Sequence, residues 1–231
     1  MKNIGMVVAV EFQAVLNRYG TQLEELSFPG YRVKKYRTDR YNLFVLDCGA
    51  GEIAAAAGTQ FLITQFNVEL VVNFGVVGGL TDEMHLAKTC IVERIVHYDF
   101  DTSALDHCEV GRYMNYPSVY IPATPELVRR AVELCPSLKP VTCASGDKFV
   151  DGAEQKQRLH AAFDADICEM EAAGIALTCN RCGVPCLFIK TVSDAVTGGA
   201  EEFRSQVGES AGLCLEVADR LIGDICWSVL P

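Results

Sequence analysis

The chain has 231 residues, 50% hydrophobic and 22% charged, which is a globular balance that suits a single sizeable core. Its net charge of −10 argues against a nucleic-acid backbone or an anionic membrane as the main partner, because both need clustered Lys and Arg. The apolar run 4–10 is too short to span a membrane, and 11 cysteines without a secretory signal indicate reduced thiols, so we expect a cytoplasmic protein.

The first third of the chain alternates between apolar runs and helical patterns. Short apolar runs bounded by turn residues predict strands, and apolar residues three or four positions apart predict helices. The predicted elements are a strand at 4–10, a helix at 11–19, a hairpin of 31–37 with 41–46, and an alanine-rich helix at 52–66.

A fully apolar strand is predicted at 70–74, and Gly75, Gly78 and Gly79 follow it. Glycine lets backbone amides approach a ligand closely, so we expect residues 75–79 to form a ligand-facing loop at the end of this strand.

The rest of the chain continues the alternation and ends in a long amphipathic helix. A region with little periodicity separates the two halves, and such long loops often form lids or interfaces. The predicted elements are a strand at 89–97, a loop at 102–122, a helix at 125–134, a strand at 140–144, helices at 154–163 and 170–180, a strand at 186–192, and a helix within 202–229.

No Pro-, Gly- or Ser-rich linker divides these elements, and no internal repeat is present. Alternating strands and helices favour an α/β fold, so we predict a single domain over residues 1–231 with a mixed, mainly parallel central sheet flanked by helices.

Three cysteines, Cys179, Cys182 and Cys186, have a spacing that loosely resembles a metal site. Structural zinc takes four ligands, usually as two short pairs, and no fourth ligand follows here. The first of the three ends a predicted helix and the last begins a strand, so we expect no metal site.

Acidic residues gather near the carboxyl end of the last predicted strand. Glu169 and Glu171 precede a helix, and Ser193-Asp194 ends the strand that follows. Open α/β sheets bind ligands at the carboxyl ends of their strands. Paired carboxylates that can flank one substrate favour cleavage of a sugar bond over metal or phosphate chemistry.

Four motifs stand in order along the chain: Asn73-Phe-Gly-Val-Val-Gly-Gly-Leu80, Ser145-Gly-Asp-Lys-Phe149, Glu169-Met-Glu-Ala-Ala173 and Val192-Ser-Asp194. Taken singly, each acid in them also fits a structural role such as a helix or turn cap. Taken together, their order and spacing resemble the nucleoside phosphorylase and nucleosidase superfamily. Within it, the chain is most similar to the 5′-methylthioadenosine/S-adenosylhomocysteine nucleosidases.

The resemblance implies cleavage of the N-glycosidic bond of a purine nucleoside on a six-stranded core sheet, without metal or organic cofactor. It also implies a homodimer in which the neighbouring subunit completes the pocket, with residues 97–116 near the 5′ end of the substrate. The implied roles are a proton or hydrogen bond to purine N7 from Asp194, orientation of that acid by Ser193, ribose binding by Glu171 and Met170, stacking on the base by Phe149, and recognition of its edge by the Val150 backbone.

The chain departs from the family pattern at the nucleophile. The glutamate that activates water in the nucleosidases aligns with Gln13, and Glu11 could replace it only through a local shift in register. In the glycine segment that contains Gly78, Val76 replaces a hydroxyl residue, and Lys190 stands where the family has arginine.

Three functions therefore stay open from sequence. The first is a hydrolase that uses Glu11 or a weakly activated water. The second is a phosphorylase that binds phosphate through Lys190 or an arginine of a partner chain. The third is a purine nucleoside-binding module without turnover.

Overall fold

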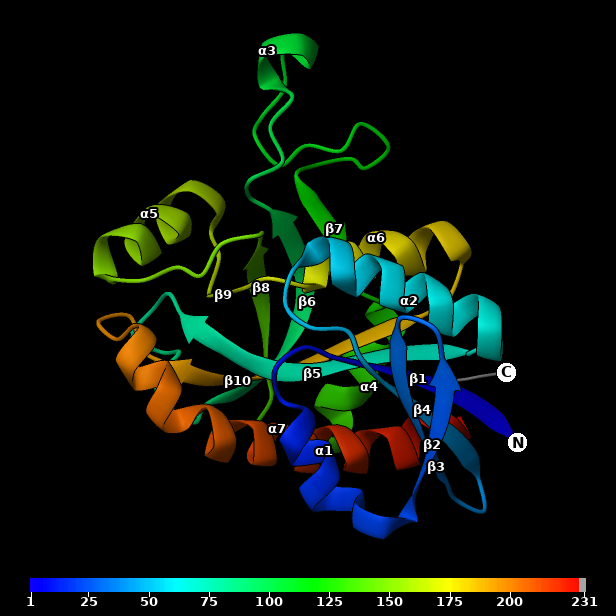
Figure 1. Cartoon of the computed structure of the whole chain (residues 1–231). Coiled ribbons are helices and arrows are strands. Elements are labelled where there is room, and N and C mark those ends of the chain that lie inside the picture. Colours follow the sequence, from blue (N-terminus) through cyan, green and yellow to red (C-terminus); the bar gives the residue numbers. More distant parts are fainter. Residues whose placement is uncertain (229–231) are drawn as a thin grey trace.

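A ten-stranded mixed sheet runs through residues 1–228, the part of the chain that the computed structural model describes (Figure 1). Its strands are β1 (Lys2–Val8), β2 (Leu23–Phe28), β3 (Tyr31–Arg37), β4 (Tyr41–Asp47), β5 (Leu70–Gly79), β6 (Thr89–His97), β7 (Tyr120–Pro122), β8 (Lys139–Ser145), β9 (Ile167–Glu169) and β10 (Cys186–Asp194). The helices are α1 (Phe12–Tyr19), the 3-10 turn η1 (Gly20–Gln22), α2 (Glu52–Phe66), α3 (Ser103–Asp106), α4 (Pro125–Leu134), α5 (Ala153–Phe163), α6 (Ala172–Cys182) and α7 (Ala200–Ser228).

The central strand of the sheet is β5. It pairs in parallel with β1 and β10, and β1 pairs in parallel with β4. At its carboxyl end β5 also pairs antiparallel with the short strand β9. Because β9 leads through β8 and β6 back to β10, the pairing closes a ring that begins and ends at β5.

Helices cover both faces of the sheet (Figure 1). The long helix α7 packs on β5 and β10, and α1 lies beside it. On the opposite face α2 and α6 pack against each other and over β1 and β10. Because helices cover both faces, every residue of β5 and β10 is buried, as expected for the central strands of a parallel sheet.

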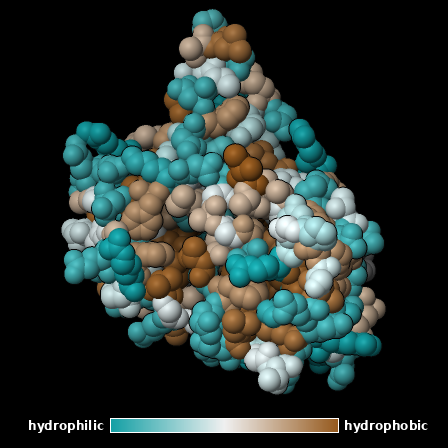
Figure 2. All heavy atoms as spheres, viewed as in Figure 1, coloured by the Kyte–Doolittle hydropathy of each residue, from teal (hydrophilic) through white to brown (hydrophobic). Residues whose placement is uncertain are grey.

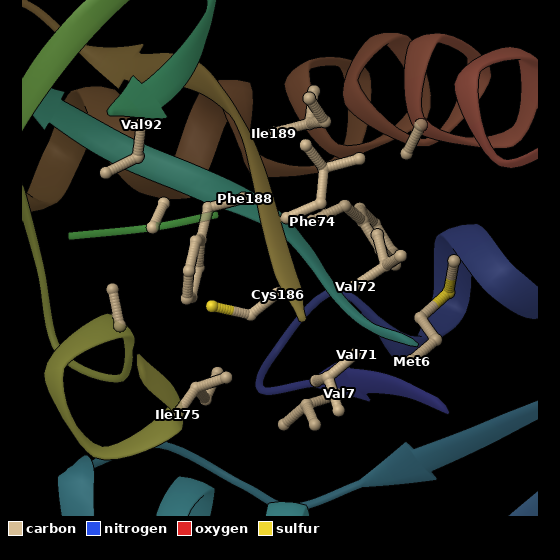
Figure 3. Packing of buried hydrophobic residues seen from close by; sticks show 14 of the residues in the cluster. Met6, Val7, Val71, Val72, Phe74, Val92, Ile175, Cys186, Phe188 and Ile189 are labelled. Atoms are coloured by element: carbon tan, nitrogen blue, oxygen red, sulfur yellow. The ribbon is translucent and has the colours of Figure 1, made fainter. Parts of the chain in front are cut away.

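Figure 3 shows this two-sided core at close range. On β10, Phe188 points toward Ile175 of α6, whereas its neighbour Ile189 points toward α7. On β5, Val72 and Phe74 lie on the α7 side. Alternation of side chains along a strand produces this arrangement.

Residues 75–79 do not form the predicted loop. They continue β5, and every residue of this strand is buried. Gly75, Gly78 and Gly79 have no positive φ, so their conformation is that of an ordinary strand. The apolar run ended the sequence prediction too early, because pairing with β9 and β10 extends the strand beyond it.

The remaining differences from prediction are short elements that tertiary pairing supports. Sequence periodicity gave no sign of β2 or β9, and α3 and β7 lie inside the predicted loop at 102–122. The predicted last helix ended at Val229, which lies outside the described residues.

The segment between β6 and β7 projects away from the body of the molecule and carries α3 at its tip (Figure 1). In the described residues, no helix combines the length and the apolar character that a membrane span requires.

Candidate active site

A cavity of about 250 Å³ opens where β1, β5, β9 and β10 end. Figure 2 shows hydrophobic residues gathered on this face, between α5 and the start of α7. Two predicted site residues, Gln13 and Lys190, are not part of the cavity wall. The predicted residues that line it are Glu11, Val76, Gly78, Phe149, Val150, Met170, Glu171, Ser193 and Asp194.

Glu11 reaches the cavity from the residue that precedes α1. Its Oε1 accepts a hydrogen bond of 2.8 Å from the Val76 amide, and its Oε2 accepts one of 3.0 Å from the Val10 amide. A side chain at Gly75 would place its Cβ 2.8 Å from Oε1, so glycine there makes room for the carboxylate. Burial raises the pKa of Glu11, although the Val76 amide and the charge of Lys190 act in the opposite direction.

Gln13 does not occupy the position that its alignment predicted. It is exposed on α1, and its Nε2 donates to Asn17 Oδ1 at 2.9 Å. Because α1 begins at Phe12, Gln13 lies on the solvent side of the helix while Glu11, before the first turn, faces the cavity. Of the two candidates that the sequence offered, it is thus Glu11 that faces the cavity, with its carboxylate bound to the backbone of Val76.

Asp194 lines the cavity at the end of β10 and is buried. The pairing of β10 with β5 shifts register between Val192 and Asp194, so Ser193 forms a bulge. Bulges re-aim the side chains that follow them, and this one lets consecutive residues both face the cavity. Ser193 Oγ donates to Asp194 Oδ1 at 3.0 Å.

The other carboxylate oxygen of Asp194 binds a buried lysine. Lys156, on α5, donates from Nζ to Asp194 Oδ2 at 2.5 Å, and its side chain is fully buried. Gly78 leaves room for the carboxylate, because a Cβ there would lie 3.0 Å from Cys168 Sγ and 3.2 Å from Asp194 Oδ2.

Glu171 lines the cavity from the residue before α6. Its Oε1 accepts a hydrogen bond of 2.9 Å from the Gly51 amide. Burial, together with the charge of Glu169, raises the pKa of Glu171 to about 7. Met170 lines the same wall.

Lys190 is buried behind the wall. Its Nζ forms an ion pair of 3.0 Å with Glu169 Oε2, and the charges of Glu169 and Glu171 raise its pKa against the effect of burial. Glu169 also accepts hydrogen bonds from the Ala172 amide and so caps α6. The prediction that Lys190 binds substrate or phosphate therefore lacks support, because its ammonium is committed to a buried carboxylate.

A further acid, Glu52 at the start of α2, lies close to this group. It accepts hydrogen bonds from Ser145 Oγ and from the Gly174 amide. Burial and the charge of Glu169 raise its pKa to about 8. Glu52 therefore lies near the charges of Glu169 and Glu171, whereas the ammonium of Lys190 is hydrogen-bonded to Glu169.

The opposite wall is aromatic. Phe149 follows β8, and its ring makes an edge contact with Phe203 of α7 at 5.5 Å between centroids. Val150 lies beside it, buried. A flat base could stack on the Phe149 ring while the Val150 backbone meets its edge.

Sequence reasoning missed Lys156, Glu52 and Phe203. The run Glu154-Gln-Lys-Gln-Arg158 looks solvent-exposed. A signal was nevertheless present, because helical spacing puts Lys156 on the same face as Leu159 and Phe163. Glu52 carried no such signal, since an acid in the first turn of a helix is common.

Comparison with known proteins adds a family. The model of the phosphorylase superfamily matches residues 4–225. An aminodeoxyfutalosine nucleosidase from Helicobacter pylori is 29% identical, with 84% of this chain and 86% of that protein matched. A 5′-methylthioadenosine/S-adenosylhomocysteine nucleosidase from Haemophilus ducreyi is also 29% identical, over 83% and 84%.

Solved structures resemble the whole fold. A Helicobacter pylori 5′-methylthioadenosine/S-adenosylhomocysteine nucleosidase in complex with a pyrrolopyrimidine–pyrrolidine compound has a TM-score of 0.89 at 26% identity, covering 96% of this chain and 98% of that one. The native futalosine hydrolase of the same organism gives the same TM-score, identity and coverage.

Proposed function

The chain belongs to the phosphorylase superfamily, and from this premise we propose that it hydrolyses the N-glycosidic bond of a purine nucleoside. The observation that carries the proposal is the convergence of Glu11, Glu171 and Asp194 on one cavity with an aromatic wall. The relatives, all named as nucleosidases or hydrolases, support the same reaction.

The chemistry needs groups on both sides of the breaking bond. As the bond between C1′ and the base nitrogen lengthens, positive charge develops on the ribose and negative charge on the purine. Asp194 is proposed to protonate or hydrogen-bond N7 of the leaving base, with Ser193 orienting it. Glu171 is proposed to accept hydrogen bonds from the ribose hydroxyls and to offset the positive charge, with Met170 packed beneath the ring.

Glu11 is proposed as the base that takes a proton from the attacking water. Burial raises its pKa, which makes the carboxylate a stronger proton acceptor than one in water. This carboxylate weakens the case for a binding module without turnover, since that alternative relied on a neutral amide at the nucleophile position.

The charges of the cavity favour water over phosphate as the nucleophile. Among the described residues that line it, Lys148 is the one cation, whereas Glu11, Glu169, Glu171 and Asp194 are acids. Lys148 Nζ itself donates to Gln155 Oε1 at 2.6 Å. Phosphate would meet a mainly anionic wall, so phosphorolysis would require a cation from a partner chain.

We further propose that the chain acts as a homodimer. Large apolar side chains are exposed at Ile53 (82%) on α2, and at Leu105 (80%) and Met114 (65%) on the projecting segment. A second copy would cover such side chains and, as the resemblance implies, could close the 5′ end of the pocket near residues 97–116. Sedimentation of the wild type against Ile53→Asp tests this assembly, and a wild-type monomer at micromolar concentration would exclude it.

The test of function is a panel of nucleosides with and without phosphate. 5′-Methylthioadenosine and S-adenosylhomocysteine are the first substrates to try, because the relatives are named for them, and inosine tests a 6-oxo base. Chromatography should detect free base in phosphate-free buffer. Base release that requires phosphate and yields ribose 1-phosphate would identify a phosphorylase, and tight binding without product would identify a binding module.

A further inference from the structure

We infer that Lys156 is a positioning residue that holds Asp194 in the orientation needed to meet the leaving base. The inference rests on the proposed function and adds to it a residue that no motif of the sequence suggested. The side chain of Lys156 is charged and entirely buried, and yet it does not line the cavity.

All the donor capacity of Lys156 is used within the protein. Its Nζ donates to Asp194 Oδ2 at 2.5 Å, to the Ala195 carbonyl at 2.6 Å and to the Asp194 carbonyl at 3.3 Å. An ammonium has three hydrogens, so none is left for a ligand. Lys156 can therefore affect a substrate only through Asp194 and the chain that follows it.

The three bonds restrict the acid in two ways. The bond to Oδ2 fixes the plane of the carboxyl group together with the Ser193 hydroxyl on Oδ1. The two carbonyl bonds fix the backbone where β10 ends, immediately after the bulge at Ser193. Catalysis by a positioned acid depends steeply on such geometry, since a misplacement of about 1 Å can cost about 10²-fold in rate.

The surroundings are shaped to admit this pair. Gly78 of β5 lies opposite Asp194, and a Cβ there would crowd Oδ2 at 3.2 Å and come into van der Waals contact with Lys156 Cε at 3.5 Å. A charged pair in a buried position is expensive to desolvate, and apolar residues of similar volume would often be at least as stable. Its presence beside the proposed acid is better explained by orientation of that acid than by stability alone.

The experiment compares Lys156→Met, which keeps the length of the side chain and removes its charge, with the wild type. We expect kcat for a purine nucleoside to fall by about 10²-fold, with KM changed by less than about threefold. Arg158→Met is the matched control, because Arg158 lies on the same helix with its side chain 75% exposed, and it should keep the wild-type rate.

A second substrate separates positioning from damage to the fold. A 4-nitrophenyl riboside has a leaving group that departs without a proton, so it does not need Asp194 as an acid. Lys156→Met should cleave it at the wild-type rate while losing activity on the purine nucleoside. Equal losses on both substrates would mean a purely structural role and would overturn the inference, as would no loss on either.

A double-mutant cycle with Asp194→Asn completes the test. If Lys156 acts through Asp194, adding Lys156→Met to Asp194→Asn should lower kcat no further, whereas independent effects would multiply. The double variant also removes both charges, so it remains a folded reference if breaking the pair destabilises Lys156→Met. Base release by the wild type tests the proposed function separately, so an active wild type with an equally active Lys156→Met would overturn only the inference.

Discussion

At the scale of single residues, the three proposed catalytic acids differ in what holds them. Backbone amides hold Glu11, an ammonium and a hydroxyl hold Asp194, and one amide holds Glu171. Burial raises the pKa of both Glu11 and Glu171, and the backbone amides that bind them act in the opposite direction.

Glu11 and Gln13 are the two candidates for the residue that activates the attacking water, and their substitution should affect kcat very differently. Glu11→Gln is expected to lower kcat by about 10²-fold or more, because an amide orients water but cannot take its proton. Gln13→Ala should leave kcat within about twofold, since the Gln13 side chain is exposed and hydrogen-bonds Asn17 on the surface. Steady-state kinetics of both variants decides, and a large loss in Gln13→Ala alone would restore Gln13 as the site residue.

Asp194→Asn tests the proposed acid. The variant keeps the shape of the side chain but cannot donate a carboxyl proton, so kcat should fall by about 10²-fold or more. Circular dichroism should be unchanged. Wild-type turnover in this variant would exclude Asp194 as the acid.

At the scale of elements, the absence of side chains at two glycines of β5 gives the site the space that it needs. Gly75 leaves space for the Glu11 carboxylate and Gly78 leaves space for the Asp194–Lys156 pair. Both glycines have ordinary strand conformations, so the requirement is for space and not for backbone freedom. One strand thus accommodates the proposed base on one neighbour, the β1–α1 connection, and the proposed acid on the other, β10.

Gly75→Ala should therefore reduce activity much more than stability. The new methyl group would meet the flexible end of Glu11, 2.8 Å from Oε1, which can move aside but then leaves its place by Val76. We expect kcat to fall at least tenfold, on the order of the loss from a misplaced catalytic group, with a small change in melting temperature.

Gly208→Ala is the control for this change. Gly208 lies in α7 with nothing within 4 Å of a Cβ, so the substitution should stabilise the chain by about 1 kcal/mol without affecting kcat. Thermal melts and kinetics of both variants check the pair. Unchanged kcat in Gly75→Ala would contradict the position assigned to Glu11.

At the scale of the whole molecule, the sheet collects acids from distant segments into one buried group. Glu52 belongs to α2, Glu169 to β9 and Glu171 to the residue before α6. Lys190 on β10 lowers the pKa of Glu169 despite burial, whereas those of Glu171 and Glu52 rise to about 7 and about 8. The fold therefore carries a pH dependence that no single element has.

Stability should fall as pH rises from about 5 to about 8. In this range the folded chain retains protons on Glu52 and Glu171 that the unfolded chain, with carboxyl groups near their ordinary value of 4.5, has already lost. The contribution of these two groups is complete below about pH 4.5 and lost above about pH 8. Urea unfolding at several pH values measures it.

Glu52→Gln should flatten this slope, because glutamine resembles the protonated acid at every pH. The same change at the exposed Glu24 should leave the slope unaltered. A slope that is identical in the wild type and in Glu52→Gln would contradict the assignment of the effect to Glu52.

The amino-acid sequence by itself determined the alternation of strands and helices, because burial on two faces requires long apolar strands and amphipathic helices whatever their partners. Its motifs also indicated most residues of the cavity through their resemblance to the nucleosidases, among them Phe149, Glu171 and Asp194. Local pattern is sufficient where a residue's position depends on its own element.

Only the tertiary structure decided which of Glu11 and Gln13 faces the cavity, how far β5 extends, and what Lys156 and Lys190 bind. Glu11 was chosen over Gln13 by the start of α1 and by an amide 65 positions away in sequence. Lys156 meets Asp194 across 38 positions, through space that Gly78 provides. Such contacts join residues that are far apart in the sequence, and the periodicity of a single helix or strand cannot predict them.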